Sequence, residues 1–494
     1  MRRADRFLPA LRRRSLLALP VAAALAGCNL APAYKVPTTP VAAQYRDTGP
    51  WVLAQPADQL PRADWWSLYG DPRLDQLQQR LLAHNADLAA ALAHYQQAQA
   101  LFREARSGYF PQIGAGAGAV RQRQSDTAPL RGATSPADYD TYTAGVQLSY
   151  EVDLWGQVRD TVAAGRDEAQ ATAADLASVQ LSLQAQLADD YLALRGIDQQ
   201  LQLLQQSIDA YRKALQLTQT LHSGGIVSGL DVARAQTQLS TVKSQWAQTA
   251  AQRAQMQDAI AVLVGESASQ FSLPAQTAAI ALPQIPLAVP STLLQRRPDI
   301  AAAERRTAEA NAGIGVARSA YFPSLTLDAQ GGFLSKRYAD LLTAPNHVWA
   351  LGPSLLFDLF DGGLRKAQVA AAKAAADEAG AKYRGVVLAA FQQVEDNLAL
   401  LDRLGAAMVD QQAAAVAAQR SLDLAMKQYK AGAASYLDVV QAQTAALQAQ
   451  SSVLTLGTQQ LRASVQLIRA LGGGWSREQL AQKPAHGGGK AAGG

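Results

Sequence analysis

The sequence contains one internal duplication, and this feature limits the possible folds more than any other. Residues 105–111 recur as residues 317–323, 212 positions later, and both copies end in Tyr-Phe-Pro. Residues 225–231 recur as residues 432–438, 207 positions later. Because the matches include Gly, Pro, Ser and Asp at fixed places, a shared alanine-rich composition does not explain them. We therefore expect two copies of one structural unit.

Each repeat is expected to run helix, strand pair, very long helix, tight turn and helix. The first repeat covers residues 72–284 and the second covers residues 285–474. The long helices are expected over about residues 160–221 and 364–430, because both stretches lack proline, which costs about 3 kcal/mol inside a helix. Apolar residues in the first stretch recur every three or four positions, close to the coiled-coil period. A helix of this length spans roughly 90 Å, which suits a tube wall better than a globular domain.

Two pairs of alternating segments are expected to form strands, over about residues 112–153 and 323–358. Within residues 141–152, apolar and polar side chains alternate along the chain. About ten residues, one apolar face and aromatic residues near the ends are typical of outer-membrane strands. A soluble antiparallel sheet shows the same alternation, but the very long helices favour the membrane interpretation. At least about eight strands are needed to close a barrel, so a spanning barrel has to be shared among several copies.

The amino-terminal segment has the features of an export signal. Arginines precede a short apolar stretch, residues 15–27, which is too short to span a bilayer as a helix. The stretch ends in Leu-Ala-Gly-Cys, and Cys28 is the only cysteine of the chain. We therefore expect residues 1–27 to be a lipoprotein signal peptide, Cys28 to carry a covalent lipid and residues 28–71 to form a lipid-anchored segment. The alternative is an ordinary signal peptide with a chance cysteine.

The charge balance argues against a nucleic-acid-binding surface. The chain has 45 Lys and Arg against 40 Asp and Glu, a net charge of +5. The expected signal peptide holds six Arg and one Asp, also +5, so the mature chain has 39 residues of each sign. No run of 18 or more apolar residues follows the signal. The glycine-rich tail, residues 475–494, is expected to be disordered.

Several motifs together resemble the TolC-type outer-membrane factors, in the lipoprotein branch called NodT. They are the lipobox with Cys28, residues 64–72, both Tyr-Phe-Pro segments, residues 151–156, residues 357–363 and two turns in which Gly is followed, after four residues, by Leu-Asp. The resemblance covers nearly everything from Cys28 to about Gly474. It implies a mainly α-helical fold with a β-barrel part. Three copies are implied to build a twelve-stranded outer-membrane β-barrel on a twelve-helix periplasmic α-barrel.

The resemblance also implies a function. The protein is expected to be the outer-membrane exit duct of a tripartite efflux pump, which passively conducts small toxic molecules or drugs and so supports antibiotic resistance. The implied partners are an inner-membrane efflux pump, a periplasmic adaptor and membrane lipid. Asn29, which follows Cys28, favours sorting to the outer membrane, from which the protein would extend into the periplasm. No cofactor is implied beyond the lipid on Cys28.

The resemblance places the functional residues at two tight turns, about residues 222–231 and 430–438. It implies that both turns dock the adaptor and that Tyr429 and Asp438 belong to a gate. The docking residues that it implies are Gly225, Ser228, Leu230, Asp231, Gly432, Ser435 and Leu437. The Ser-x-x-Asp spacing in each turn also predicts a capping box for the next helix, which would explain both Ser–Asp pairs by itself.

Two positions near the second turn depart from the family pattern. Gln441 stands where a further acid is common, and Ala434 stands where one relative has an arginine. The resemblance therefore does not say which residues form the ionic network of the gate at these two positions. Lys427 and Lys430 are candidate substitutes, and their alternative role is that of solvated helix ends.

The sequence contains no nucleotide-binding motif, no Gly-x-Ser-x-Gly elbow and no cluster spaced for a metal ion. The protein is therefore not expected to be an enzyme, and a partner has to supply the energy for transport. A lipid-anchored adaptor or coiled-coil scaffold remains as one alternative, although it would not need duplicated strand pairs. A channel that exports proteins remains as another alternative, because the sequence does not show whether the cargo is a small molecule or a protein.

Overall fold

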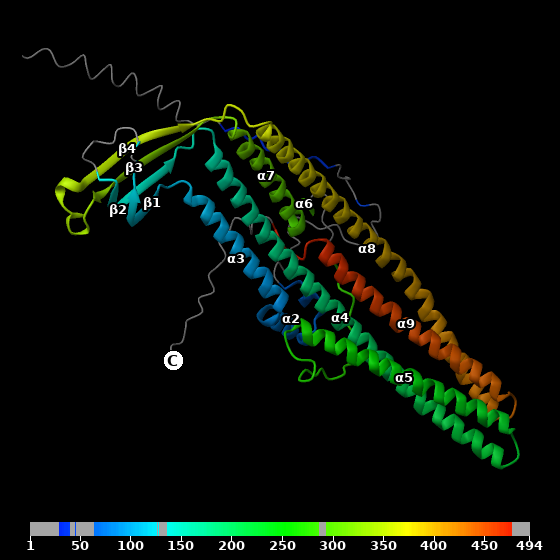
Figure 1. Ribbon diagram of the computed structural model, residues 1–494. Helices are drawn as coiled ribbons and strands as arrows, with labels where there is room; N and C mark the ends of the chain where they lie inside the picture. The colour runs from blue at the N-terminus through cyan, green and yellow to red at the C-terminus, as the bar shows by residue number, and fades with distance from the viewer. Residues whose placement is uncertain are drawn as a thin grey trace, which may run out of the picture. The chain divides into compact units, whose positions relative to one another are not determined.

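The computed structural model describes residues 29–39, 45, 64–125, 127, 136–285 and 293–476. Cys28, the expected signal peptide and residues 477–494 of the tail lie outside the described residues. The elements follow one another along the chain as Figure 1 shows. They are η1 (Trp65–Tyr69), α2 (Pro72–His84), α3 (Ala86–Ser107), β1 (Gln112–Arg123), β2 (Asp138–Glu151), α4 (Gln157–Ser223), α5 (Gly229–Leu263), α6 (Leu293–Arg296), α7 (Pro298–Ser319), β3 (Ser324–Ser335), η3 (Tyr338–Asp340), η4 (Ala344–Asn346), β4 (His347–Leu356), α8 (Leu364–Lys430) and α9 (Tyr436–Ala470).

The duplication in the sequence is matched by paired elements of equal length. Helices α3 and α7 have 22 residues each, α4 and α8 have 67 each, and α5 and α9 have 35 each. Helix α8 has the bounds expected from the sequence, and α4 is slightly longer than expected at both ends. In the part of the chain that the structure describes, no helix combines the length and apolarity needed to cross a bilayer.

The chain divides into two compact units, and each unit takes segments from both repeats. We call the first the strand unit; it consists of Met1–Pro37, Gln96–Ala171 and Ala303–Tyr383. We call the second the helix unit; it consists of Thr38–Tyr95, Thr172–Ala302 and Arg384–Gly494. The repeats are therefore a division of the sequence, whereas the compact units are assembled from pieces of both repeats.

The strand unit contains one antiparallel sheet with the order β1-β2-β3-β4, so β1 and β4 are its edge strands (Figure 1). The central pair approaches closely where glycines oppose each other, at Gly145 and Gly332. A Cβ on Gly145 would lie 2.9 Å from the carbonyl oxygen of Gly331, so a larger residue does not fit there. Large apolar side chains, among them Ile113, Trp349 and Leu351, are exposed on β1 and β4. Unpaired strand edges are normally covered by another strand, a helix or a loop, because their N–H and C=O groups need hydrogen-bond partners.

In each repeat an aspartate starts the long helix. The Asp153 carboxylate accepts the backbone N–H of Val158 at 3.2 Å and of Arg159 at 3.0 Å, and it pairs with the Arg159 guanidinium. Asp361 accepts the backbone N–H groups of Gly363 and Arg365 in the same way. Because the first N–H groups of a helix have no partner within it, these carboxylates stabilise the starts of α4 and α8.

The described residues after Cys28 lie along α7 within the strand unit. The carbonyl of Leu30 accepts a hydrogen bond from Arg318 at 2.9 Å, and that of Pro32 accepts one from the Asn311 amide at 2.8 Å. The Tyr34 hydroxyl donates to the Glu304 carboxylate at 3.0 Å. The amino-terminal segment is therefore bound to the second repeat by polar contacts.

The helix unit has a core that joins η1 and α2 to the middle of α4 and α8 and to the carboxyl ends of α5 and α9. Trp65, Trp66 and Leu74 pack there with Leu187 and Leu467, among other buried residues. The Tyr69 hydroxyl lies 2.7 Å from the Ser464 hydroxyl within this core. A second apolar cluster lies near the turns and takes residues from α4, α5, α8 and α9. The two helix pairs are therefore packed together up to their turns.

Candidate functional site

The turns that join α4 to α5 and α8 to α9 have the same backbone structure. Gly225 and Gly432 both have φ +73°, the left-handed region that glycine adopts without a steric penalty. In the first turn Gly225 N–H bonds His222 O and Ile226 N–H bonds Leu221 O, each at 2.9 Å. Gly432 and Ala433 make the equivalent bonds in the second turn. This pattern is a Schellman motif, which ends a helix by satisfying its last carbonyls.

The aspartates that follow the two turns differ in what they bind. Asp438 accepts both the N–H of Ser435, at 3.0 Å, and its hydroxyl, at 2.8 Å. The predicted capping box is therefore confirmed at this end of α9. In the first turn the hydroxyl of Ser228 donates to Asp231 at 3.2 Å, and Arg234 lies 3.4 Å from the same carboxylate. Asp231 therefore pairs with side chains, whereas Asp438 also binds the backbone.

Tyr429 is buried where the two helix pairs meet. Its hydroxyl donates to the hydroxyl of Thr218 on α4 at 3.2 Å, and its ring meets the Tyr436 ring edge-on, with centroids 5.2 Å apart. Burial, with Tyr429 nearby, raises the pKa of Tyr436 to about 12. The gate tyrosine implied by the resemblance thus lies inside the packed end of its own chain, and Asp438 lies at its surface.

Sequence reasoning did not single out Tyr436 or Thr218. Tyr436 directly follows the capping Ser435, and an aromatic residue at the first position of a helix is a signal that could have been noticed. Thr218 lies on α4, 211 residues before Tyr429, and no local pattern links the two. The turn residues implied to dock an adaptor are all exposed except the half-buried Asp231.

The two turns present different surfaces. The first exposes Ile226, with 71% of its surface accessible, together with Leu230. The second exposes Leu437, and Lys427 and Lys430 are exposed just before it. The first turn is thus the more apolar of the two, and the second is flanked by positive charge.

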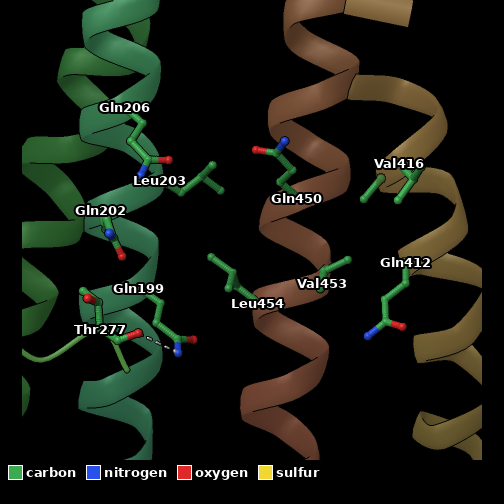
Figure 2. Close-up of a pocket in the computed structure, with 11 residues that line it drawn as sticks. Gln199, Gln202, Leu203, Gln206, Thr277, Gln412, Val416, Gln450, Val453 and Leu454 are labelled. Carbon is green, nitrogen blue, oxygen red and sulfur yellow. Dashed lines mark hydrogen bonds between the residues drawn. The ribbon is translucent and has the colours of Figure 1, made fainter. Parts of the chain in front are cut away.

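A groove of about 600 Å³ lies between α4, α8 and α9 in the helix unit (Figure 2). Its walls are uncharged amide and aliphatic side chains, and Gln199 donates to the carbonyl of Thr277 at 3.5 Å. The glutamines that line it are Gln199, Gln202, Gln206, Gln412 and Gln450. Among the residues that the structure describes, no group of three His, Cys, Asp or Glu side chains could hold a metal ion. The groove therefore offers polar contact surface and no acid–base group.

The fold of this chain, a sheet with two open edges and paired helices that end in matched turns, is also that of a solved outer-membrane channel. The chain belongs to the outer membrane efflux protein family, whose profile matches residues 77–266 and 289–473. It is therefore an efflux channel protein of the outer membrane that extends into the periplasm. Proteins of this family are transporters rather than enzymes.

Named relatives cover almost the whole chain. The pyoverdine export outer membrane protein OpmQ of Pseudomonas aeruginosa is 34% identical over 88% of this chain and 92% of its own length. The antibiotic efflux pump outer membrane protein ArpC of Pseudomonas putida is 32% identical over 94% and 96%. Among solved structures, the outer-membrane channel OprN superposes with a TM-score of 0.81 at 28% identity, covering 91% of this chain and all of that one.

Proposed function

We propose that three copies of the mature chain form the passive exit duct of a tripartite efflux pump, and that small toxic molecules are its cargo. The observation that carries the proposal is the pairing of two equal helix hairpins with a four-stranded sheet that is open at both edges. Three copies supply twelve strands, more than the roughly eight needed for closure, and their long helices supply a twelve-helix wall. The relatives named for antibiotic and pyoverdine efflux support small molecules over proteins as cargo.

The proposal assigns the turns to gating and docking. Asp438 is exposed at the second turn, so three copies would place an acidic ring at the narrow end of the tunnel, which attracts cations and repels anions. Tyr429 would support this ring by packing. The exposed apolar residues of the first turn suit a periplasmic adaptor, through which an inner-membrane pump delivers the cargo.

The proposal also assigns the amino-terminal region. Residues 1–27 are removed, Cys28 is lipidated and residues 28–71 run from the anchor onto the channel. The contacts of Leu30, Pro32 and Tyr34 with α7 support this course, because they bind the residues after Cys28 to the strand unit. Residues 72–284 and 285–474 are the two repeats, and residues 475–494 form the tail.

Electron cryo-microscopy of the detergent-solubilised protein tests the assembly. We expect a threefold hollow particle with a continuous lumen. A compact monomer, or a rod without a lumen, would remove the duct and favour a lipid-anchored scaffold instead. Mass spectrometry of the mature amino terminus tests the anchor, and a Cys28→Ala variant without lipid is its control.

Planar-bilayer recording tests the gate. Asp438→Asn should lower the preference for cations over anions, because it removes three charges from the proposed ring. Asp231→Asn is the matched control, since its carboxylate is already paired with Arg234. Equal selectivity in both variants and the parent would place the ring elsewhere.

A further inference from the structure

Inside the strand unit, the connection after β2 holds the start of β3. Trp155 lies four residues beyond the end of β2, and Phe322 lies two residues before β3. Their rings stack with centroids 4.6 Å apart and planes 23° from parallel. The indole N–H of Trp155 also donates to the carbonyl of Pro323 at 2.8 Å. This contact joins the first repeat to the Tyr-Phe-Pro segment of the second.

Because of the duplication, two further aromatic residues occupy the equivalent positions at the outer edges of the sheet. Phe360 lies four residues beyond the end of β4, in the sequence Asp-Leu-Phe that matches Asp-Leu-Trp around Trp155. Phe110 lies two residues before β1, in the Tyr-Phe-Pro segment that matches the one around Phe322. The second pair thus has the same positions relative to its strands as the stacked pair.

The exposure of these rings shows that Phe110 and Phe360 do not stack on each other within one chain. Phe322, covered by Trp155, is 40% accessible, whereas its counterpart Phe110 is 65% accessible. Phe360 is 91% accessible. Since β1 and β4 are opposite edges of the sheet, three strand spacings or about 14 Å separate them. Phe360 therefore has no route to Phe110 of its own chain while the sheet stays open.

We infer that Phe360 of one copy stacks on Phe110 of the next copy, where β4 pairs with the neighbouring β1. This inference rests on the proposed homo-oligomer and names one of its contacts. The intrachain register pairs Glu151 with Thr326, so the equivalent pairing sets Leu356 opposite Gly114 of the neighbour. Because phenylalanine has no N–H group, the new contact lacks the hydrogen bond that Trp155 makes to Pro323.

Thiol cross-linking between separate chains tests the contact. Chains carrying Phe110→Cys and chains carrying Phe360→Cys are co-expressed and treated with a short thiol-specific reagent. We expect cross-linked chain pairs, and none with either variant alone. Cys28 is the only native cysteine, so the parent protein reports its background. The matched control is Trp155→Cys with Phe322→Cys, which should cross-link within one chain and not between co-expressed chains.

A gain-of-stability variant tests the same contact without cysteines. Phe360→Trp supplies an indole N–H, which would donate to the carbonyl of Pro111 of the neighbour as Trp155 donates to Pro323. It should raise the temperature at which the oligomer dissociates. Phe110→Ala should abolish this gain. Leu359→Trp, at an equally exposed neighbouring position, is the control and should give no gain that depends on Phe110. The coupling between Phe110 and the aromatic residue at position 360 should be about 2- to 12-fold in the dissociation constant.

The outcomes separate this contact from the proposed function. An oligomer shown by native mass spectrometry without cross-linking or coupling at these positions overturns the inference and leaves the exit duct in place. A monomer overturns both. Cross-linking between chains together with loss of the Trp gain in Phe110→Ala supports the inference.

Discussion

The two helix turns of this protein share a backbone and differ in their side chains. Both glycines have φ +73° and both turns end their helix with the same hydrogen bonds. At the position where the second turn buries Tyr429, the first exposes His222, which bonds Val227 O at 2.9 Å. Tyr436 likewise has Gly229 as its counterpart. The two copies share the turn, but the second has an aromatic core and the first has an open apolar surface.

Substitution of Tyr429 should give the largest difference in stability between the two turns. Tyr429→Ala deletes a buried aromatic ring and the bond to Thr218, for which we expect a loss of about 3–5 kcal/mol in local stability. His222→Ala removes an exposed ring and one hydrogen bond and should cost about 1 kcal/mol or less. Hydrogen exchange at the amides of α8 and α9 near the second turn measures the effect of Tyr429→Ala, and exchange at the amides of α4 and α5 near the first turn measures the effect of His222→Ala.

Equal losses of stability in Tyr429→Ala and His222→Ala would contradict the packing role of Tyr429. They would show that Tyr429 leaves the aromatic cluster in the assembled channel, as a residue lining the constriction would. Tyr429→Phe is the control, because it keeps the ring and loses only the bond to Thr218. It should cost about 1 kcal/mol.

The starts of the two long helices offer a second comparison. Asp160 is the fourth residue of α4, and the fourth residue of α8 is Ala367. Asp160 is buried against Gly315, and one carboxylate oxygen has no hydrogen-bond partner among the described residues. Burial, with Asp153 nearby, raises the pKa of Asp160 from 3.8 to about 6. Its ionisation in the folded state is therefore unfavourable.

The Asp160→Asn variant should be more stable than the parent at neutral pH, by up to about 3 kcal/mol. Because the folded pKa lies above the unfolded one, the cost is absent below about pH 4, grows until about pH 6 and is constant above. Melting temperatures between pH 4 and pH 8 measure this difference. Asp153→Asn, which weakens the cap of α4, should destabilise instead. A parent protein whose stability does not fall between pH 4 and pH 6 would show that Asp160 is solvated.

The sequence was sufficient for features with a local or periodic cause. Proline-free stretches with apolar residues every three or four positions predicted both long helices, and Ser435 with Asp438 predicted a cap that the structure contains. Family resemblance, rather than spacing, supplied the channel function. Alternating residues predicted strands, but not which strands form the edges of the sheet.

Contacts between distant segments could not be predicted. Tyr429 lies on a long helix, and its position does not reveal that the Thr218 hydroxyl accepts a hydrogen bond from its hydroxyl. Asp160 looks like an ordinary acid in a first helical turn, where a negative charge is usually favourable. The close approach of α7 at Gly315 contributes to its burial, and that approach depends on the tertiary fold.

The capping aspartates should give a smaller difference. Asp438→Ala removes a carboxylate that accepts a backbone N–H and a hydroxyl, and should cost about 1 kcal/mol. Asp231→Ala breaks contacts with an exposed serine and a partly exposed arginine, and should cost a few tenths of a kcal/mol. Hydrogen exchange in the first turns of α9 and α5 compares them. A larger loss in α5 would mean that Asp231 gains a partner in the assembled channel.

The smallest difference is expected where the turns are most alike. Gly225→Ala and Gly432→Ala each place a Cβ on a residue with φ +73°, and this backbone strain should cost about 1–2 kcal/mol in each turn. No steric clash adds to the cost, because nothing lies within 4 Å of either added atom. The strain of the backbone is then the only term, and it is the same in both turns. Melting temperatures of the two variants should therefore agree. If one variant loses much more stability, a neighbouring chain or partner contacts that glycine, and the two turns are inequivalent in the assembly even where their backbones coincide.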